Sequence, residues 1–325
     1  MIRFGILGTA AIARSFLGVP LRNAAISAVA SRDAGRAASF AREHNIPLHY
    51  GRYEDLLADP SIDAVYVPLP PAMHASWVVK AAEAGKHVLV EKPAAPTSSD
   101  VQSMVDACRK YNVLYMEAFM YRFKAIHRRV RDIVSGGVLG ELRYIDFSWC
   151  FNMKALRRSA FRLETEAGGG ALNDLGVYGV DFLRFLGLPA PAVVHASIQR
   201  EKAGGVDMFS HAVLRTGGAL MSLTCGFTCD ANYYVLGGEK GSVHVPGSLS
   251  GRKAPNVAYT HSLENDRREE ELFEAENPYA AEMEYFADCI LRGVPPEADG
   301  EGSLANVRIL EQIKAFAADN NSLRG

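Results

Sequence analysis

The sequence predicts two domains: an α/β domain with a doubly wound parallel sheet over residues 1–118, and an α+β domain with a mostly antiparallel open sheet over residues 119–325. Three observations support this division. Apolar runs alternate with amphipathic segments in the first part of the chain, which is typical of parallel sheets covered by helices. The later part alternates apolar and polar residues, which is typical of an antiparallel sheet with one solvated face. The length of 325 residues also suits two domains.

The first domain is predicted to alternate strands with helices. Short apolar runs predict the strands, and apolar residues at helical spacing predict the helices, one of which Asp33 is expected to cap. Because such sheets bind ligands outside the carboxyl ends of their strands, residues at those ends are candidates for a site. The predicted strands are 2–8, 26–31, 63–70, 87–91 and 113–118, and the predicted helices are 33–45, 73–84, 99–111 and a segment after the turn at residue 8.

The second domain is predicted to consist mainly of strands. Gly217-Gly218 marks a hairpin turn, and the polar stretch 252–277 predicts an irregular, loop-rich segment. The predicted strands are 141–151, 192–201, 208–227 and 233–247, with helices within 166–187 and near 278–292 and 303–318. An alternative for the last of these helices is that it packs back on the first domain.

Composition and charge argue against several classes of protein. A formal net charge of −2 gives no electrostatic case for binding nucleic acid or an anionic membrane. No apolar run approaches the roughly 18–20 residues of a membrane span, and we expect no signal peptide at the N-terminus. The five cysteines are scattered and odd in number, which predicts reduced thiols in a cytoplasmic protein. No cluster of His, Cys or carboxylate residues suggests a metal.

The turn after the first strand reads GTAAIA over residues 8–13. It matches the dinucleotide-binding pattern G-x-G-x-x-G/A, except that alanine replaces the second glycine, and it predicts a Rossmann domain. The helix expected next would offer N–H groups and a positive dipole end to phosphates. The alternative is that small residues simply suit a tight strand-to-helix turn. The candidate coenzyme-binding residues here are Gly8, Thr9, Ala10 and Ile12.

The end of the second strand bears on the choice of coenzyme. NAD-binding chains usually place Asp or Glu there, where it binds the ribose hydroxyls. This strand ends in Ser31-Arg32, and a hydroxyl with a guanidinium suits the 2′-phosphate of NADP. In the alternative interpretation, Arg32 is solvated and Asp33 binds the ribose of NAD. The sequence therefore predicts NADP, with NAD as the less favoured coenzyme.

Glu91-Lys92-Pro93 follows directly after a strongly apolar strand. Charged groups at the end of a buried strand cost solvation unless something there uses them. This strand end is the edge where a nicotinamide should lie, so Lys92 is a candidate catalytic residue. Pro93 restricts Lys92 to extended geometry and allows a cis bond that would fix the direction of the lysine. The alternative is a solvated lysine paired with Glu91.

Asp174 and Tyr178 follow a run of three glycines and are four residues apart, so they share one face of a helix. Oxidation of a secondary alcohol by hydride transfer needs a base, and the reverse reaction needs an acid. A free tyrosine has a pKa of about 10, which a nearby lysine ammonium such as Lys92 would lower. The alternatives are that Asp174 complements the helix dipole and that Tyr178 is a packing residue.

These motifs together resemble the glucose–fructose oxidoreductase and inositol dehydrogenase (Gfo/Idh/MocA) family. The similar stretches are GILGTAAIA at the start, YVPLPPAMHASW (66–77), AGKHVLVEKP (84–93), EAFMYRF (117–123), AGGGALNDLGVYGVDFLRFL (167–186) and, more weakly, GEKGSV (238–243). They span most of the chain. Tyr178 is similar to the branch with xylose and dihydrodiol dehydrogenases, whereas the inositol dehydrogenase branch has His at that position.

The resemblance implies an NAD(P)-dependent dehydrogenase or reductase that acts on CH–OH groups of sugars or cyclic polyols. It implies that Lys92 and Asp174 are catalytic-site residues, and that Tyr178 marks a branch that commonly prefers NADP. It also implies a homodimer or homotetramer that assembles through the second-domain sheet. The remaining coenzyme-binding candidates are Pro70, His74, Glu91 and Lys92.

Aromatic residues and arginines near the expected site suggest a ring-shaped substrate with several hydroxyl groups. Core packing and surface salt bridges are the alternative explanation for each of them. The substrate-binding candidates are Phe119, Arg122, Phe151 and Arg162. The sequence does not specify which sugar reacts, or at which carbon.

Two other functions are compatible with this fold. One is a regulator that senses NAD(P) without catalysis, although a sensor has no need of an acid–base set such as Lys92, Asp174 and Tyr178. The other is an NAD-dependent glycosidase, in which the hydride returns to the substrate within each cycle. An assay for net hydride transfer distinguishes both from a dehydrogenase.

Overall fold

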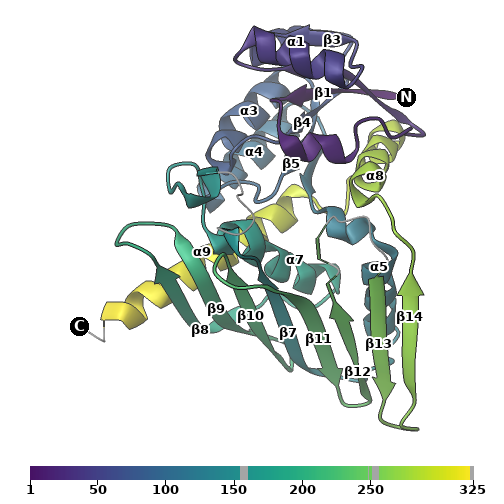
Figure 1. The fold of residues 1–325 in the computed structure, drawn as a ribbon, viewed down its shortest axis with the longest axis vertical. Coiled ribbons are helices and arrows are strands. Elements are labelled where there is room, and N and C mark those ends of the chain that lie inside the picture. Colours follow the sequence, from purple (N-terminus) through teal and green to yellow (C-terminus); the bar gives the residue numbers. More distant parts are fainter. Residues whose placement is uncertain (154–159, 248, 251–255, 323–325) are drawn as a thin grey trace. The chain divides into compact units, whose positions relative to one another are not determined.

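The computed structural model describes residues 1–153, 160–247, 249–250 and 256–322 (Figure 1). The chain forms two compact units. The first contains residues 1–120 and 277–304, and the second contains residues 121–276 and 305–325. The segment 277–304 thus groups with the first unit, whereas the sequence analysis placed everything after residue 118 in the second domain.

A six-stranded parallel sheet with the order β3-β2-β1-β4-β5-β6 forms the centre of the first unit. The expected doubly wound fold is confirmed. The two short elements β3 and α2 were not predicted. The strands are β1 (Ile2–Leu7), β2 (Ala24–Ala30), β3 (Leu48–Tyr50), β4 (Ala64–Val67), β5 (His87–Glu91) and β6 (Tyr115–Ala118), and the helices are α1 (Ala34–Glu43), α2 (Tyr53–Ala58), α3 (Pro71–Glu83), α4 (Ser98–Lys110) and α8 (Pro278–Arg292).

Local sequence explains where the helices of this unit begin and where they pack. Asp33 is the N-cap of α1 as predicted, since its side chain accepts a hydrogen bond from the Arg36 N–H at 3.0 Å. Helix α8 buries Phe286, whose ring centroid lies 6.3 Å from that of Phe4 on β1. This apolar contact explains why α8 groups with the parallel sheet despite its distance along the chain.

The second unit is built on an eight-stranded sheet with the order β14-β13-β12-β11-β7-β10-β9-β8. All neighbouring strands are antiparallel except β7 and β10, so the expected mostly antiparallel sheet is confirmed. The strands are β7 (Leu142–Cys150), β8 (Ala192–Arg200), β9 (Asp207–Thr216), β10 (Ala219–Gly226), β11 (Ala231–Gly238), β12 (Gly241–Pro246), β13 (Asn256–Ser262) and β14 (Arg268–Phe273), and the longer helices are α5 (Ala125–Ser135), α7 (Val177–Phe185) and α9 (Gly300–Ser322), the last of which begins in the first unit.

Helices α5 and α7 cover one face of this sheet and leave the other open (Figure 1). Phe147 and Leu223 point to the covered face and are buried. Gly179 lets α7 approach closely, because a Cβ at this position would collide with the side chain of Leu223. On the open face, Tyr144 and Leu220 are directly paired across β7 and β10 and are 47% and 45% exposed. The solvated face therefore carries large apolar side chains next to polar ones such as Asp146 and Ser222.

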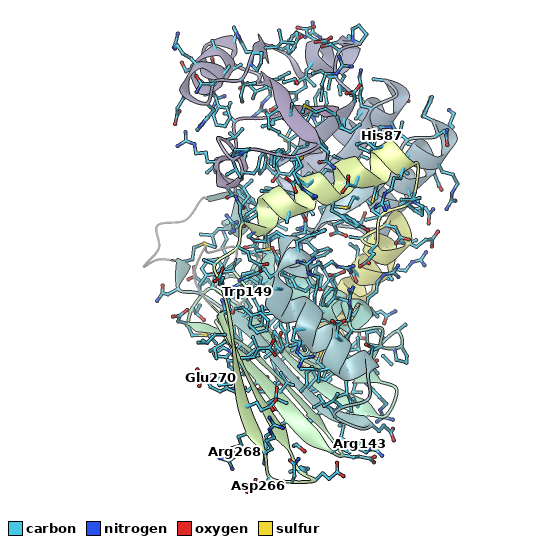
Figure 2. The ribbon with its side chains drawn as sticks, turned by 90° about the vertical axis from the view of Figure 1, so that its right-hand side faces the viewer. His87, Arg143, Trp149, Asp266, Arg268 and Glu270 are labelled. Atoms are coloured by element: carbon cyan, nitrogen blue, oxygen red, sulfur yellow. The ribbon has the colours of Figure 1, made fainter. Side chains whose placement is uncertain are left out.

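The segment 252–277 differs from the expected irregular loop. Residues 252–255 lie outside the described residues, but β13 and β14 pair as an antiparallel hairpin at the edge of the sheet. Figure 2 labels Asp266, Arg268 and Glu270 in this hairpin. Nearly every residue of β14 is exposed, so the strand has no buried face, and the apolar alternation that reveals a half-buried strand is missing.

We predict that His87 makes the first unit less stable in acid. Its Nδ1 accepts a hydrogen bond from the Leu114 N–H at 2.9 Å, which requires an unprotonated Nδ1. Burial lowers the pKa of His87 below its ordinary value of 6.5. The unfolded chain therefore binds a proton before the folded chain does, and stability is lost as the pH falls from about 6.5 to the lower folded pKa.

The measurement is urea unfolding at pH 7.5 and pH 5.5, followed by the fluorescence of Trp77 in a Trp149→Phe background. In His87→Asn the amide oxygen can still accept from Leu114 but does not titrate, so we expect a smaller loss of stability in acid. The loss that remains should come partly from His74, whose pKa is also lowered by burial. An unchanged acid-induced loss in His87→Asn would contradict the prediction.

Candidate active site

The glycine turn after β1 has the backbone geometry that the dinucleotide pattern requires. Gly8 has a φ of 108°, which L side chains rarely adopt, and a Cβ there would lie 3.2 Å from Leu69. Ala10 has a φ of −71°, so the alanine that replaces the second glycine is unstrained. The turn therefore keeps glycine where the conformation demands it. Thr9 lies in the same turn, and Ile12 lies in the short helical segment that follows it.

The α-helix that the sequence predicts directly after this turn does not form. In its place lies a five-residue 3₁₀ segment, η1 (Ala11–Ser15). Gly18, with a φ of 77°, and Pro20 follow it closely and stop helical propagation. The dipole of a long helix is thus absent at this point, so the backbone N–H groups of the turn and nearby side chains would have to hold the phosphates.

Two arginines and a tyrosine lie close to the glycine turn. The Tyr53 hydroxyl is 3.7 Å from the position of a Cβ at Gly8. Burial raises the pKa of Tyr53, while the guanidinium groups of Arg32 and Arg36 act in the opposite direction, which places both positive charges near this hydroxyl. Ser31 is buried beside them. Tyr53 and Arg36 were not among the residues predicted from the sequence, although Arg36 lies only four residues after Arg32.

At the carboxyl end of β5, Glu91 and Lys92 follow the buried apolar strand. Glu91 Oε1 accepts a hydrogen bond from the Tyr66 hydroxyl at 2.6 Å. Tyr66 is buried, and its ring packs edge-on against Phe16 at 5.3 Å. The Lys92–Pro93 peptide bond is cis, as the sequence allowed. The segment that carries Lys92 is therefore tied through Glu91 and Tyr66 to the segment that follows the glycine turn.

His74 lies behind this edge of the sheet and is fully buried. Its Nδ1 is 3.1 Å from the carbonyl oxygen of Pro93 and 3.0 Å from that of Ala94, and its Nε2 is 2.7 Å from the carbonyl oxygen of Leu69. Burial lowers the pKa of His74, and the carbonyl contacts oppose this shift. These contacts connect the turn before α3, which contains Pro70, to the turn after Lys92, so this position favours a supporting role.

Asp174 and Tyr178 lie in the second unit on consecutive helical turns. Asp174 belongs to a π-helical turn, η4 (Leu172–Gly176), and Tyr178 to the first turn of α7. Asp174 Oδ2 accepts a hydrogen bond from Arg162 Nε at 2.7 Å. The ring of Tyr178 is 4.4 Å from that of Trp149 on β7. π-Helical turns occur often at functional sites, and this one places a carboxylate, a guanidinium and two aromatic rings in one neighbourhood.

The glycines before Asp174 are required by close packing. A Cβ at Gly169 would collide with the carbonyl group of Arg162, and a Cβ at Gly170 would collide with the carboxylate of Asp207. Gly170 also has a φ of 111° and donates its N–H to the Arg162 carbonyl oxygen at 2.9 Å. The glycine run therefore brings Arg162 beside the turn that carries Asp174.

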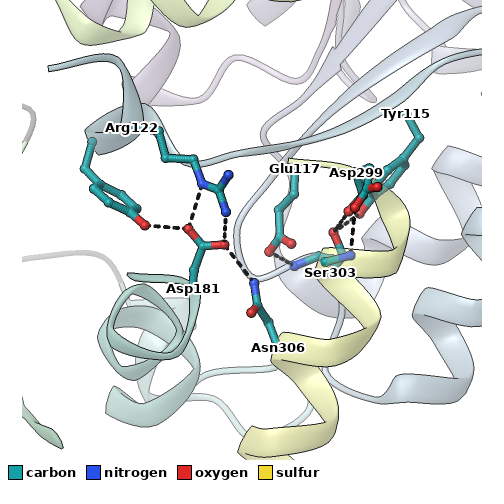
Figure 3. A network of polar contacts seen from close by, with 10 residues as sticks. Tyr115, Glu117, Arg122, Asp181, Asp299, Ser303 and Asn306 are labelled. Atoms are coloured by element: carbon teal, nitrogen blue, oxygen red, sulfur yellow. Dashed lines mark hydrogen bonds and ion pairs between the residues drawn. The ribbon is translucent and has the colours of Figure 1, made fainter. Parts of the chain in front are cut away.

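Arg122, a predicted substrate-binding residue, is buried against another side chain of the second unit. It forms a buried ion pair with Asp181, with distances of 2.9 Å from Nε and 2.5 Å from Nη2 (Figure 3). The same carboxylate accepts hydrogen bonds from the Tyr121 hydroxyl at 2.6 Å and from Asn306 Nδ2 at 3.1 Å. Tyr121 in turn contacts Tyr178, with 5.8 Å between ring centroids. This network favours a structural role for Arg122 behind Tyr178.

The remaining predicted substrate-binding residues, Phe119 and Phe151, belong to different units. Phe119 is buried in the first unit. Phe151 is buried in the second, with its ring 5.3 Å from that of Phe227. Lys92 belongs to the first unit and Tyr178 to the second, so the pairing of these two residues stays a prediction. Within the described residues no group of three or more His, Cys, Asp or Glu side chains is arranged for a metal ion.

Comparisons with known proteins match both parts of the chain. Residues 2–119 match the family described as "Oxidoreductase family, NAD-binding Rossmann fold", and residues 127–244 match the GFO/IDH/MocA C-terminal domain. Among curated proteins, the chain is 35% identical to D-xylose 1-dehydrogenase (NADP(+)) 2 of Haloferax volcanii, with 95% of each chain covered. It is 30% identical to trans-1,2-dihydrobenzene-1,2-diol dehydrogenase of Xenopus laevis, with 90% of each covered.

A comparison with solved structures also finds an oxidoreductase. The chain is similar to KijD10, a 3-ketoreductase from Actinomadura kijaniata in complex with NADP and TDP-benzene, with a TM-score of 0.87, 29% identity and 97% of each chain covered. Among the described residues, no helix has the length and apolar character needed to cross a membrane.

Proposed function

The chain belongs to the GFO/IDH/MocA family of oxidoreductases, and we propose that it transfers a hydride between NADP and a secondary alcohol or ketone of a sugar or cyclic polyol. The observation that carries the proposal is the cluster of Asp174, Arg162 and Tyr178 beside Trp149, on a glycine-bounded π-helical turn. The relatives of the chain include D-xylose 1-dehydrogenase (NADP(+)) 2 and a trans-1,2-dihydrobenzene-1,2-diol dehydrogenase.

The first unit has residues that fit an NADP molecule. Gly8 has the positive φ of 108° that the tight turn of the dinucleotide pattern requires of its first glycine. Arg32 and Arg36 place two guanidinium groups near Tyr53, and no acidic residue ends β2. Guanidinium groups bind phosphate oxygens with charge-assisted hydrogen bonds. We therefore assign Ser31, Arg32 and Arg36 to the 2′-phosphate of NADP.

The proposed chemistry uses Tyr178, Lys92 and Asp174, with Arg162 and Trp149 in supporting roles. The bound nicotinamide supplies or accepts the hydride. Tyr178 gives or takes the proton at its hydroxyl oxygen, and Lys92 is assigned to orient this hydroxyl and lower its pKa. Asp174, oriented by Arg162, is assigned to position the substrate hydroxyl. Trp149 packs on Tyr178 and limits the orientations of its ring.

The substrate is proposed to be a ring that carries several hydroxyl groups. The rings of Trp149 and Phe151, on and just after β7, are 9% and 7% exposed, and we assign their remaining open surface to the apolar face of a sugar ring. Arg162 and Asp174 offer a donor and an acceptor to neighbouring hydroxyls. Arg122 is left out of this set because its guanidinium is buried against Asp181.

We also propose that the chain assembles as a homodimer or homotetramer through the open face of the eight-stranded sheet. Tyr144, Leu220 and Tyr259 share this face and are 47%, 45% and 42% exposed. Apolar side chains gathered on one sheet face are typical of an interface between subunits. Sedimentation equilibrium of wild type and Leu220→Glu tests this assembly.

The experiment that tests the coenzyme assignment replaces Arg32 with alanine. We expect the affinity for NADP to fall about 10- to 100-fold, since a lost hydrogen bond to a charged group costs about 1.5–3 kcal/mol. The affinity for NAD should change little, because NAD lacks the 2′-phosphate. Coenzyme binding is measured by titration, and turnover of both coenzymes is measured with a panel of keto sugars and cyclic diols. Arg42→Ala, an exposed arginine at the other end of α1, is the matched control.

Three outcomes would contradict parts of the proposal. An unchanged ratio of the two affinities in Arg32→Ala would defeat the coenzyme assignment. Coenzyme binding without hydride transfer to any substrate would favour an NAD(P)-sensing regulator. Release of an aglycone with no net change in absorbance at about 340 nm would favour a glycosidase that returns the hydride to its substrate within each cycle.

A further inference from the structure

A lysine on the C-terminal helix is directed at the segment that precedes Asp174. Lys314 on α9 is partly buried, and its Nζ donates a hydrogen bond to Asn173 Oδ1 at 2.8 Å. Burial lowers the pKa of Lys314, and the carboxylates of Asp207 and Glu311 oppose this shift, while Arg200 adds to it. The hydrogen bond to Asn173 offsets part of the cost of withdrawing this ammonium group from water.

The lysine determines which way the Asn173 amide points. A lysine ammonium has three donors and no acceptor, so it must face the oxygen of the amide. The NH₂ group then points in the opposite direction, where it donates to the carbonyl oxygens of Gly168 at 3.0 Å and Gly169 at 3.2 Å. In this orientation both ends of the Asn173 amide are satisfied.

The glycine turn held in this way determines the position of Asp174. The Gly170 carbonyl oxygen accepts a hydrogen bond from the Asp174 N–H at 3.0 Å, and the Gly170 N–H is bonded to the Arg162 carbonyl group. Arg162 also binds the Asp174 carboxylate through its side chain. The chain of contacts runs from Lys314 through Asn173 and the glycines to the carboxylate.

We propose that Lys314 is a positioning residue, which acts through Asn173 to hold the glycine turn and thereby the Asp174 carboxylate in a single orientation. The catalytic consequence rests on the function proposed above, whereas the ordering of the turn does not. Asp207 holds the residues that follow this turn, because its Oδ2 accepts a hydrogen bond from the Leu172 N–H at 2.6 Å. Removing the lysine leaves the Asp207 contact in place, so the turn should loosen without unfolding.

The test compares Lys314→Met, which keeps the length of the side chain but not the donor, with Lys314→Arg, which keeps a donor. Arg308→Met, an exposed cation on the same helix, is the matched control. We expect kcat with NADP and the best sugar substrate to fall about 10- to 100-fold in Lys314→Met, since a small misplacement of a reacting group has this effect. The KM for NADP should not change, and Lys314→Arg should recover most of kcat.

A second readout needs neither substrate nor coenzyme. Amide hydrogen exchange of peptides that cover residues 165–178 should accelerate in Lys314→Met, while peptides from β9 and β10 keep their wild-type rates. Equal exchange in wild type and Lys314→Met would overturn the proposal, whatever the enzyme catalyses. Faster exchange throughout the second unit would also overturn it, because that pattern indicates a general loss of stability. Local acceleration in a protein that turns over no sugar would support the positioning role and reject the proposed function.

Discussion

Replacing Tyr178 with phenylalanine is expected to lower kcat by about 10²–10⁴-fold, the range that general acid–base catalysis contributes. The substitution removes only the hydroxyl, so the ring should keep its contacts with Trp149 and Tyr121 and the fold should be unchanged. The affinity for NADP should stay close to that of wild type. Steady-state kinetics with the best sugar substrate and coenzyme titration measure these quantities.

The pH dependence separates a proton-transfer role from a binding role. If Tyr178 carries the proton, the limb of the kcat profile that reports its ionisation should disappear in Tyr178→Phe. Tyr111→Phe, which removes a hydroxyl from an exposed tyrosine at the end of α4, is the matched control and should behave as wild type. A kcat near the wild-type value in Tyr178→Phe would refute the assignment of the proton donor.

Lys92→Met in the same assay tests whether Lys92 lowers the pKa of Tyr178. If Lys92 lowers the pKa of Tyr178, the limb that Tyr178 controls should move to higher pH in this variant. A limb that stays in place would indicate that Lys92 binds substrate or coenzyme and does not tune the tyrosine.

The sequence predicted the fold well because short runs of consecutive buried apolar residues mark the parallel strands, whereas alternation of buried and exposed residues marks the antiparallel ones. The strands at 87–91 and 141–151 were found almost at their observed bounds, since each has a buried face. The strand Leu48–Tyr50 was missed because three mostly exposed residues carry no periodic signal. The edge strand Arg268–Phe273 was missed for the same reason, and its charged side chains made the segment look like a loop.

The candidate site was predictable only where its residues follow a local pattern. Asp174 and Tyr178 became candidates because they are four residues apart after a glycine run, and Lys92 because it ends an apolar strand; their roles stay predictions. The contact between Lys314 and Asn173 joins residues 141 positions apart, and no short motif records it. The same applies to Arg122, whose partner Asp181 lies 59 residues away and converts an apparent substrate ligand into part of a buried network.

Arg122→Met is expected to destabilise the second unit by about 3–5 kcal/mol, which is the usual cost of removing one partner from a buried ion pair. The side chains of Arg122 and Asp181 are only 6% and 2% exposed, so water cannot replace the lost guanidinium. Urea unfolding followed by the fluorescence of Trp149 in a Trp77→Phe background reports on this unit, because these are the two tryptophans of the chain.

A double variant distinguishes the buried charge from a simple loss of packing. In Arg122→Met/Asp181→Asn the carboxylate charge is gone, while the amide oxygen introduced at position 181 can still accept the hydrogen bond from Tyr121. The double variant should therefore recover part of the stability that Arg122→Met alone loses, because the cost of an uncompensated charge is removed. If Arg122 instead binds substrate, Arg122→Met would raise the KM for the sugar and leave the unfolding curve unchanged. That result would support the original prediction that Arg122 binds substrate, and it would show that the ion pair between Arg122 and Asp181 does not stabilise the second unit.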